Sequence, residues 1–368
     1  MLWWQLPGPS RFVTSVVEDL RDGKNVILRL PEYVPSGIAA AVRETLGNHD
    51  LWSWCPLRTD ECRDEPAPLL FSKFIPGTHP QTIRNAHSLS GNDSFSGKLI
   101  WVDVTSGTTW PGWKSFIVDY AHACRSRSLL ERSLFCLCLA GQLALDPPPE
   151  DVCLSHQSWQ GIVDNLDMLL YTSALLREKQ MPDLYRRIAT SIVARLALWD
   201  PEVSQRLVRE EMTRILEPAE VLKEMAIDRG WLTPEQKLPP TSWHTGAKGL
   251  FDGKERTHSA ALAVDDPSNE LRRRVWSAEV EVIFPLIEEK RQELIKTIAG
   301  VLTHRTVSEL QDMQIGEIEL EMSRRGNRVP YELRRQVKTL KEMRNSLAHL
   351  EPLSPGLIIS NEIKGIPL

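Results

Sequence analysis

Two short apolar runs limit what the N-terminal part of this chain can fold into. Asn25–Leu30 and residues 99–104 each place aliphatic side chains next to one another over a short stretch. Runs of that length are too short for an ordinary helix and are typical of buried strands. After the first run, residues 31–35 predict a loop, and Ser36 is the expected N-cap of a helix that reaches Leu46. This order of strand, loop and helix predicts an α/β fold for the start of the chain.

From about Trp110 to Trp231 the pattern is helical. Apolar residues recur at spacings of three and four, which indicates amphipathic helices. The predicted helices span residues 115–125, 129–143, 158–176, 182–198, 203–216 and 218–230. Three acids in this region, Asp164, Asp167 and Asp200, are expected to cap helices or to lie on solvated faces. The chain as a whole is therefore predicted to be mainly α, with an N-terminal α/β part.

The segment 232–269 is polar and irregular, with several prolines and glycines, which is typical of a linker or a long surface loop. We therefore expect three parts in sequence order. They are an α/β domain with a helical subdomain over residues 1–231, the linker over residues 232–269, and a helical domain over residues 270–368.

The last hundred residues predict a bundle of three helices, over residues 271–303, 307–324 and 330–349. Pro285 should kink or split the first helix, because proline removes a backbone donor and clashes with the preceding turn. Pro330 suits the first position of the third helix, where the missing N–H costs nothing.

The end of the third helix carries the one motif in the chain that suggests chemistry. Arg344 is followed by the polar Asn345, and His349 comes after a gap of four residues from the arginine. Asn345 and His349 lie one turn apart and share a face, whereas Arg344 lies about 140° around the helix from His349. An apolar face predicts a core stripe of Leu333, Val337, Leu340 and Leu347. A basic face of the same helix contains Arg334, Lys338, Lys341 and Arg344.

This motif, in an all-helical bundle, resembles the ribonuclease motif of the HEPN superfamily over about residues 271–355. The resemblance implies RNA cleavage that needs no metal ion and no cofactor. His349 would move a proton as general base or acid, Arg344 would hold the scissile phosphate, and Asn345 would orient the histidine or a phosphate oxygen. HEPN nucleases pair two copies, so the resemblance also implies a homodimer formed through the C-terminal helical domain. The RNA-binding residues would be Arg334, Lys338 and Lys341.

Each of these residues also has a plainer interpretation. In a chain with 44 lysines and arginines and nine histidines, such a spacing can arise by accident. His349 could simply suit the negative end of a helix dipole, and Arg344 could be a solvated cation paired with Glu342 or Glu351. Many HEPN domains, moreover, dimerise without catalysing a reaction.

The N-terminal part resembles, in outline, a P-loop ATPase of the AAA or STAND type. Asp103, near the end of the second apolar run, stands where such a protein holds its Walker B aspartate. The phosphate-binding residues are missing, however: the loop after the first run contains Glu32 and two prolines but no lysine, and the chain has no Gly-Lys-Ser or Gly-Lys-Thr. Val104 replaces the glutamate that activates water. The resemblance implies a degenerate domain that is not an active ATPase; another kind of α/β domain stays open.

Composition restricts function only weakly. A net charge of −5 gives no overall nucleic-acid footprint, so contact with RNA would need a local basic patch. The six cysteines lack the paired spacing of a zinc site, and Cys136 and Cys138 are expected as buried, reduced thiols. The first residues lack the features of a signal peptide, and no apolar run is long enough to cross a membrane. We therefore expect a cytoplasmic protein.

Two functions fit these patterns. The first is an endoribonuclease that is restrained or aimed by an inactive ATPase-like domain, which resembles bacterial antiviral and toxin–antitoxin effectors. The second is a non-catalytic scaffold that docks on an ATPase or another defence component and dimerises through its helical end. The twelve tryptophans, many of them in the first third, are expected in the core, although a partner surface would also use them.

Overall fold

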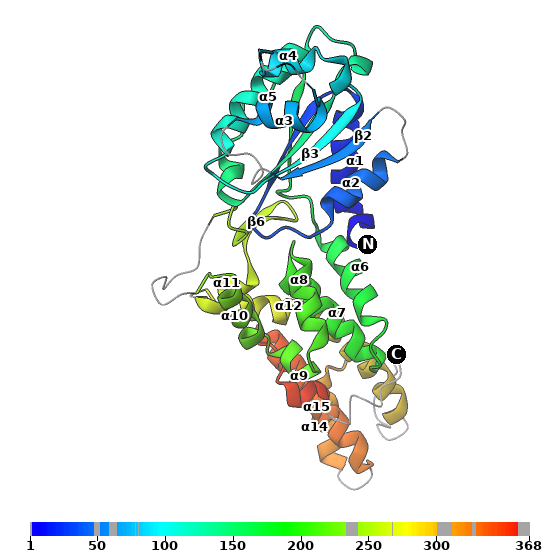
Figure 1. Ribbon diagram of the computed structural model, residues 1–368. Coiled ribbons are helices and arrows are strands. Elements are labelled where there is room, and N and C mark those ends of the chain that lie inside the picture. The colour runs from blue at the N-terminus through cyan, green and yellow to red at the C-terminus, as the bar shows by residue number, and fades with distance from the viewer. Residues whose placement is uncertain are drawn as a thin grey trace. The chain divides into compact units, whose positions relative to one another are not determined.

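The chain forms two compact units that interleave along the sequence. The computed structural model describes residues 2–47, 52–58, 65–77, 79, 81–232, 242–266, 268–299, 311–325 and 329–359. Unit 1 comprises Met1–Asp167 and Pro240–His258, and unit 2 comprises Met168–Pro239 and Ser259–Leu368. The fold is mixed α/β, with a parallel sheet in unit 1 and a set of packed helices in unit 2 (Figure 1).

Unit 1 is built on a five-stranded sheet in which every pair of neighbours is parallel. The strand order is β2-β3-β4-β1-β5. The strands are β1 (Asn25–Leu30), β2 (Ser53–Arg58), β3 (Lys98–Val104), β4 (Leu134–Ala140) and β5 (Leu154–Ser158). The two strands expected from the apolar runs are thus confirmed as β1 and β3. Most side chains of β1 and β4 are apolar, because parallel strands are covered on both faces.

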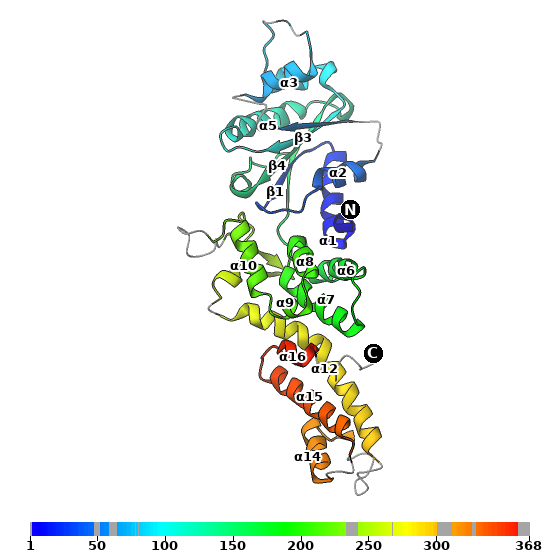
Figure 2. The same ribbon diagram turned by 60° about the horizontal axis from the view of Figure 1, so that its bottom comes forward.

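Helices cover both faces of this sheet. Figures 1 and 2 show α1 and α2 on one face and α3, α4 and α5 on the other. Their bounds are Pro7–Arg21 for α1, Ile38–Leu46 for α2, Pro66–Phe74 for α3, Ala86–Ser90 for α4 and Trp110–Cys124 for α5. The N-cap of α2 is Gly37, with φ of 90°, rather than the predicted Ser36. A left-handed backbone at this position favours glycine, which explains the one-residue shift.

Strand β4 corrects the prediction of a helix over residues 129–143. The run Leu134–Leu139 is buried on both faces at the centre of the sheet, and Cys136 and Cys138 lie in it as buried thiols. Periodicity cannot separate a short, fully apolar strand from a buried helix, because both lack a polar face. Gly141 follows the strand directly with φ of 60°. The sequence signal against a continuing helix was the glycine itself, because glycine weakens a helix interior.

Two further predictions were wrong in part. The helix expected over residues 158–176 begins only at Asn165 and is α6 (Asn165–Leu176), because Ser158 ends β5 and a turn follows it. The segment expected as a linker contains a hairpin of β6 (Lys248–Phe251) and β7 (Lys254–Thr257), and α11 (Ser259–Val264) follows it. The strands of this hairpin are only four residues long, which is too short for a period-two pattern to be recognised.

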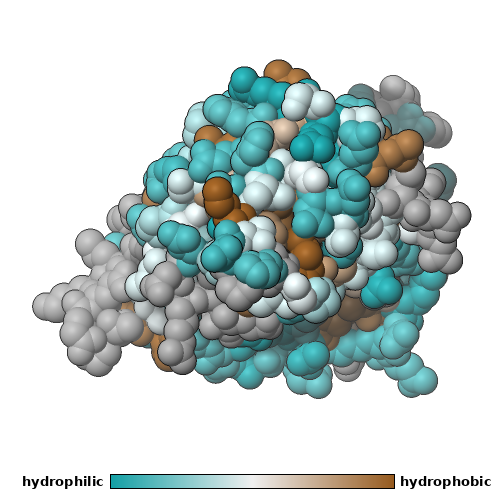
Figure 3. Space-filling view, turned by 45° about the horizontal axis from the view of Figure 1, so that its top comes forward, coloured by the Kyte–Doolittle hydropathy of each residue, from teal (hydrophilic) through white to brown (hydrophobic). Residues whose placement is uncertain are grey.

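Most of the early tryptophans serve the core of unit 1, as expected. The buried ones are Trp3, Trp4, Trp101, Trp110 and Trp113, each at most 7 % exposed. In the face of the molecule shown in Figure 3, the surface is mainly hydrophilic or neutral, and hydrophobic colour is confined to small patches. The indoles therefore contribute to the fold itself, since they are buried against their own chain.

The start of α1 is fixed by an acid from the start of α6. Asp167 accepts a hydrogen bond of 2.9 Å from the backbone N–H of Gly8 and one of 3.1 Å from that of Asp164. Asp164 Oδ1 in turn accepts a hydrogen bond of 3.0 Å from the N–H of Asp167. Both acids therefore cap helix ends, as predicted. Desolvation raises the pKa of the buried Asp167 carboxyl, an effect that these backbone donors oppose.

We predict that Gly8→Ala destabilises unit 1 by about 1–3 kcal/mol, the usual cost of overpacking. A Cβ at Gly8 would overlap Ile162 O and Asp167 Oδ2. Gly107→Ala is the matched control, because the nearest atom to its Cβ is Leu143 Cδ2 at 4.0 Å. Chemical denaturation of both variants checks this; equal midpoints for the two would contradict it.

Unit 2 consists of helices that pack around α12. This helix, Glu270–Ile298, runs as one element through Pro285. Of the two predicted effects of this proline, the split is therefore wrong, and the kink stays a prediction. Its neighbours include α7 (Asp183–Ala197), α11 and α15 (Tyr331–Ala348), and α14 (Ile315–Arg325) packs on α15. Ser191 Oγ in α7 donates to Ala278 O in α12 at 3.2 Å, so helices expected in two different domains lie in one unit.

The helix expected over residues 203–216 is two helices, α8 (Pro201–Arg209) and α9 (Met212–Leu216). Glu210 and Glu211 between them are extended, with ψ near 160°. Lys179 Nζ donates to Val208 O at 3.1 Å and to Glu210 O at 2.5 Å, which satisfies carbonyls at the end of α8. A long-range lysine cap of this kind leaves no local sequence signal.

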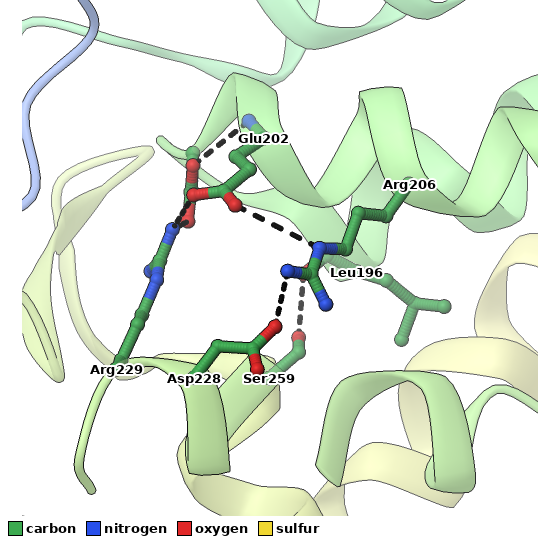
Figure 4. A network of polar contacts seen from close by, with 7 residues as sticks. Leu196, Glu202, Arg206, Asp228, Arg229 and Ser259 are labelled. Atoms are coloured by element: carbon green, nitrogen blue, oxygen red, sulfur yellow. Dashed lines mark hydrogen bonds and ion pairs between the residues drawn. The ribbon is translucent and has the colours of Figure 1, made fainter. Parts of the chain in front are cut away.

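A network of ion pairs joins α8 to α10 (Ala219–Asp228), as Figure 4 shows. Arg229 Nη2 lies 2.6 Å from Asp200 Oδ2 and 2.7 Å from Glu202 Oε2. Asp200 also accepts from the Glu202 N–H at 2.9 Å and so caps α8, as predicted. Arg206 pairs with Glu202 and Asp228 nearer the surface. The inner pair is desolvated, with side chains 5 % and 9 % exposed.

We predict that Arg229→Met lowers the free energy of unfolding by about 3–5 kcal/mol, because it leaves the buried Asp200 carboxylate without its guanidinium. Arg206→Met should cost less than about 1 kcal/mol, since that arginine is 31 % exposed and its partners are about half exposed. Urea unfolding of the two variants measures the difference. Similar losses in both would show that burial does not set the strength of this network.

Candidate functional site

The candidate motif lies at the end of α15, which packs on α12 and α14. Val337, Leu340 and Leu347 of the predicted core stripe are buried, and Leu333 is half-buried. Met343 adds a buried side chain that the pattern missed. The apolar stripe of α15 is therefore confirmed as a core face, and α15 begins after Pro330 as N-cap rather than with Pro330 as its first residue.

An indole fixes the last turn of α15 against α12. Trp276 Nε1 donates a hydrogen bond of 2.8 Å to Leu347 O. The last carbonyls of a helix have no partner within the helix, so a side chain that binds one of them holds the helix end in place. The motif residues on either side of Leu347 are therefore positioned by an anchor in α12.

Arg344 lines an open pocket on unit 2. Its side chain is half-buried, and Nη2 donates to Gln314 Oε1 at 2.9 Å. The pocket has a volume of about 330 Å³ and also includes Phe284, Glu288 and Arg291 of α12. The partner of Arg344 is thus a neutral amide rather than Glu342 or Glu351, the acids expected if the arginine were only part of a solvated ion pair.

His349 is exposed and forms the C-cap of α15. Its backbone N–H donates to Asn345 O at 3.0 Å and to Ser346 O at 3.1 Å. This turn keeps His349 beside Asn345, as predicted from their spacing. Neither residue lines the pocket that contains Arg344. One copy of the chain therefore joins the histidine to the asparagine but leaves the arginine on another face.

The predicted basic face is partly neutralised. Lys341 Nζ lies 2.6 Å from Glu319 Oε2 of α14, and Lys338 Nζ lies 3.9 Å from Glu342 Oε1. Arg334 is half-buried, and its Nε is without a hydrogen-bond partner among the described residues. The role of these three residues in RNA binding stays a prediction, and Lys338 has the most exposed side chain of the two lysines.

Sequence reasoning missed Arg291 as a residue of this region. Its Nε lies 2.9 Å from Glu288 Oε2, and its Nη1 donates to Gln311 O and Met313 O, each at 2.8 Å. The Glu288–Arg291 spacing indicates a helical ion pair, but nothing in the sequence indicated that the arginine also holds the segment before α14. That segment ends in a turn at Gln314, whose N–H donates to Glu317 Oε2 at 2.7 Å.

This turn corrects the second predicted helix of the bundle, which was expected to begin at Val307. Met313 and Gln314 are not helical, and α14 begins at Ile315. Residues 300–310 lie outside the described part of the chain, as does Gly326, the expected residue after this helix.

The loop between β1 and α2, where a P-loop would bind phosphates, makes contacts with its own unit. The Glu32 N–H donates to His244 O at 2.8 Å, and Trp4 Nε1 donates to Ser36 O at 2.9 Å. Trp4 also lies against Gly37. Asp103 accepts a hydrogen bond of 2.9 Å from Trp101 Nε1. The loop is therefore held by contacts within unit 1.

In the part of the chain that the structure describes, no group of three His, Cys, Asp or Glu side chains is placed to hold a metal ion. None of the described helices is both long enough and apolar enough to span a membrane. Comparison with known proteins gives no further assignment: no protein family and no curated protein matches this chain.

A buried acid lies on α12 one turn from Trp276. Glu279 is 0 % exposed. Its Oε2 accepts a bond of 2.8 Å from the N–H of Leu353, in the segment between α15 and α16 (Pro355–Ile359). Its Oε1 is buried and has no partner among the described residues. Desolvation raises the pKa of this carboxyl from 4.5 to about 8, despite the opposing backbone donor.

We predict that Glu279 makes the protein less stable as pH rises. Its pKa is higher in the folded than in the unfolded chain, so the folded state holds the proton between about pH 4.5 and 8. Stability is therefore greatest below this window and falls through it, with a slope approaching about 1.4 kcal/mol per pH unit. Glu279→Gln should flatten that slope, because the amide stays neutral and can still accept from Leu353.

Urea unfolding of wild type and variant at several pH values between 5 and 8.5 measures this effect. Glu289→Gln, at an exposed position of the same helix, is the control and should retain the wild-type slope. Parallel curves for wild type and Glu279→Gln would contradict the prediction.

Proposed function

We propose that the protein is a metal-independent endoribonuclease that acts as a homodimer through its C-terminal helices. The observation that carries this proposal is the placement of Arg344, whose guanidinium lines an open pocket and bonds to a neutral glutamine. A cation of this kind is available to an anionic ligand, because no described carboxylate forms an ion pair with it. The exposure of His349 supports the proposal too.

The reaction would use the ribose 2′-OH as nucleophile against the adjacent phosphorus. His349 would take the proton from the hydroxyl or give one to the leaving 5′-oxygen. Arg344 would bind the phosphate and stabilise the charge that develops in the transition state. Asn345 would orient the imidazole or a phosphate oxygen. The products would be a 2′,3′-cyclic phosphate and a 5′-hydroxyl, and DNA would resist because it lacks the nucleophile.

The active site would be shared between two copies. Within one helix Arg344 and His349 lie about 140° apart, so a single copy directs them to different faces. A twofold interface repeats each surface on the partner and can bring the arginine of one copy to the histidine of the other. Lys338, Lys341 and Arg334 would contact the RNA on either side of the cleft.

Unit 1 would regulate the nuclease as a degenerate ATPase-like domain. The contacts of Glu32 and Ser36 within unit 1 support a role without ATP hydrolysis. The protein would act as an effector in bacterial antiviral defence or in a toxin–antitoxin system. This role rests on analogy with proteins that join a regulatory domain to a HEPN nuclease.

A second candidate is the non-catalytic scaffold, which would dock on an ATPase or another defence protein and dimerise through the same helices. The ion pair between Lys341 and Glu319 favours it, because this pair removes a cation from the face that would meet RNA. Under this alternative, Arg344 and His349 would have no catalytic role.

We expect the purified protein to cleave single-stranded RNA in EDTA and to leave the matching DNA intact. Arg344→Ala and His349→Ala should each reduce the rate by about a hundredfold or more, the usual contribution of such groups. Glu332→Gln, at an exposed position in the first turn of α15, is the matched control. Gel analysis and end-group mapping of the products measure the outcome, and absence of cleavage by the wild type would favour the scaffold.

Mixing the two inactive variants tests the shared site. A 1:1 mixture of Arg344→Ala and His349→Ala should recover about a quarter of wild-type activity, because half of randomly paired dimers are mixed and each contains one complete site. Activity in the wild type without recovery in the mixture would place both residues of each site in one copy.

A further inference from the structure

The pocket beside Arg344 has a lining that the proposed chemistry does not use. Its volume of about 330 Å³ is in the range of small-molecule sites. It lies entirely within unit 2, between α12, the turn that precedes α14, and α15. The proposed reaction needs only the guanidinium of Arg344 from this pocket. A phosphate alone would leave most of the lining without a ligand.

Two charged groups of the lining already have structural partners. Arg291 is bonded to Glu288 and to the carbonyls of Gln311 and Met313. The Glu288–Arg291 pair is neutral as a whole and holds the wall of the pocket in place. Arg344 is therefore the cation of the lining that a ligand would meet, with Gln314 orienting its fork.

An aromatic ring lies in the same lining. Phe284 is 38 % exposed, which is unusual for a phenylalanine, and it lies on α12 next to Pro285. An exposed ring beside a cation is the combination used to bind single-stranded nucleic acid, where a base stacks on the ring and the phosphate meets the cation. Alkyl or purely ionic ligands would use only one of these two features.

The remaining polar groups fit the edge of a base. Asp312 and Gln314 are both exposed and line the pocket. A carboxylate accepts hydrogen bonds from the amino groups of bases, and an amide can donate as well as accept. The lining therefore favours a ligand that has both an amino-bearing ring and a phosphate.

We propose that this pocket binds one nucleotide of the single-stranded RNA substrate, with its base stacked on Phe284, its edge at Asp312 and Gln314, and its phosphate on Arg344. The choice of RNA rests on the proposed ribonuclease function. The pocket would then determine which nucleotide precedes the cleaved bond, because the 3′-phosphate of the bound nucleotide would be the scissile one.

Binding without cleavage tests this proposal. The probes are the four nucleoside 3′-monophosphates, the matching nucleosides and inorganic phosphate, each titrated into the full chain in EDTA by calorimetry. At least one monophosphate should bind tighter than phosphate by tenfold or more. Phe284→Ala should weaken its binding by about five- to hundredfold, the range expected for loss of one stacked base, and Phe284→Tyr should restore it. Arg344→Gln should reduce the preference for the monophosphate over its nucleoside.

Leu320→Ala is the matched control, because this side chain is 52 % exposed on α14 and lies outside the pocket. Thermal melting establishes that each variant is folded. The proposal is overturned if no monophosphate binds tighter than phosphate, or if Phe284→Ala binds like the wild type. Base-selective binding without RNA cleavage would support the nucleotide pocket and refute the nuclease. RNA cleavage that Phe284→Ala leaves unchanged would support the nuclease and refute the pocket.

Discussion

The burial of one long helix governs the arrangement of unit 2. α12 spans 29 residues and packs its apolar side chains against α7, α11 and α15. Its length brings together features that are far apart in sequence: Trp276 anchors the end of α15, Glu279 holds the segment after it, and Phe284 and Arg291 line the pocket beside Arg344. A change in the position of α12 would therefore move the candidate site as a whole, since each of its walls is attached to this helix.

The parts of the fold that could be predicted were those with a local pattern. The run Asn25–Leu30 is a strand because it is short, apolar and followed by a proline-containing loop, and α15 carries its own amphipathic stripe. β4 could not be distinguished from a helix, because a strand buried on both faces has no polar period. The hairpin of residues 248–257 was missed because its two strands are very short and gain their stability from packing.

The same reasoning explains what was predictable in the candidate site. Arg344, Asn345 and His349 were found because their spacing is local to one helix, and the backbone bond from His349 to Asn345 follows from that spacing. The pocket depends on Phe284 and Gln314, which approach Arg344 only after three helices have packed. Contacts of this kind depend on tertiary structure and cannot be predicted from spacing in the sequence. The hydrogen bond from Arg344 to Gln314 is another example.

The interleaving of the two units affects how the protein can be made. Unit 1 needs Pro240–His258 and unit 2 needs Met168–Pro239, so each unit uses a segment that lies within the other's span of sequence. A ribosome must therefore pass residue 258 before unit 1 is complete, and unit 2 draws on residues from both sides of that segment. A chain that ends at His258 retains all of unit 1, and a chain that begins at Met168 retains all of unit 2, but each also carries the segment of the other unit that lies between. The fragment that ends at His258 would expose the face of α7 that packs on α12, so an isolated unit 1 needs an internal deletion as well as a truncation.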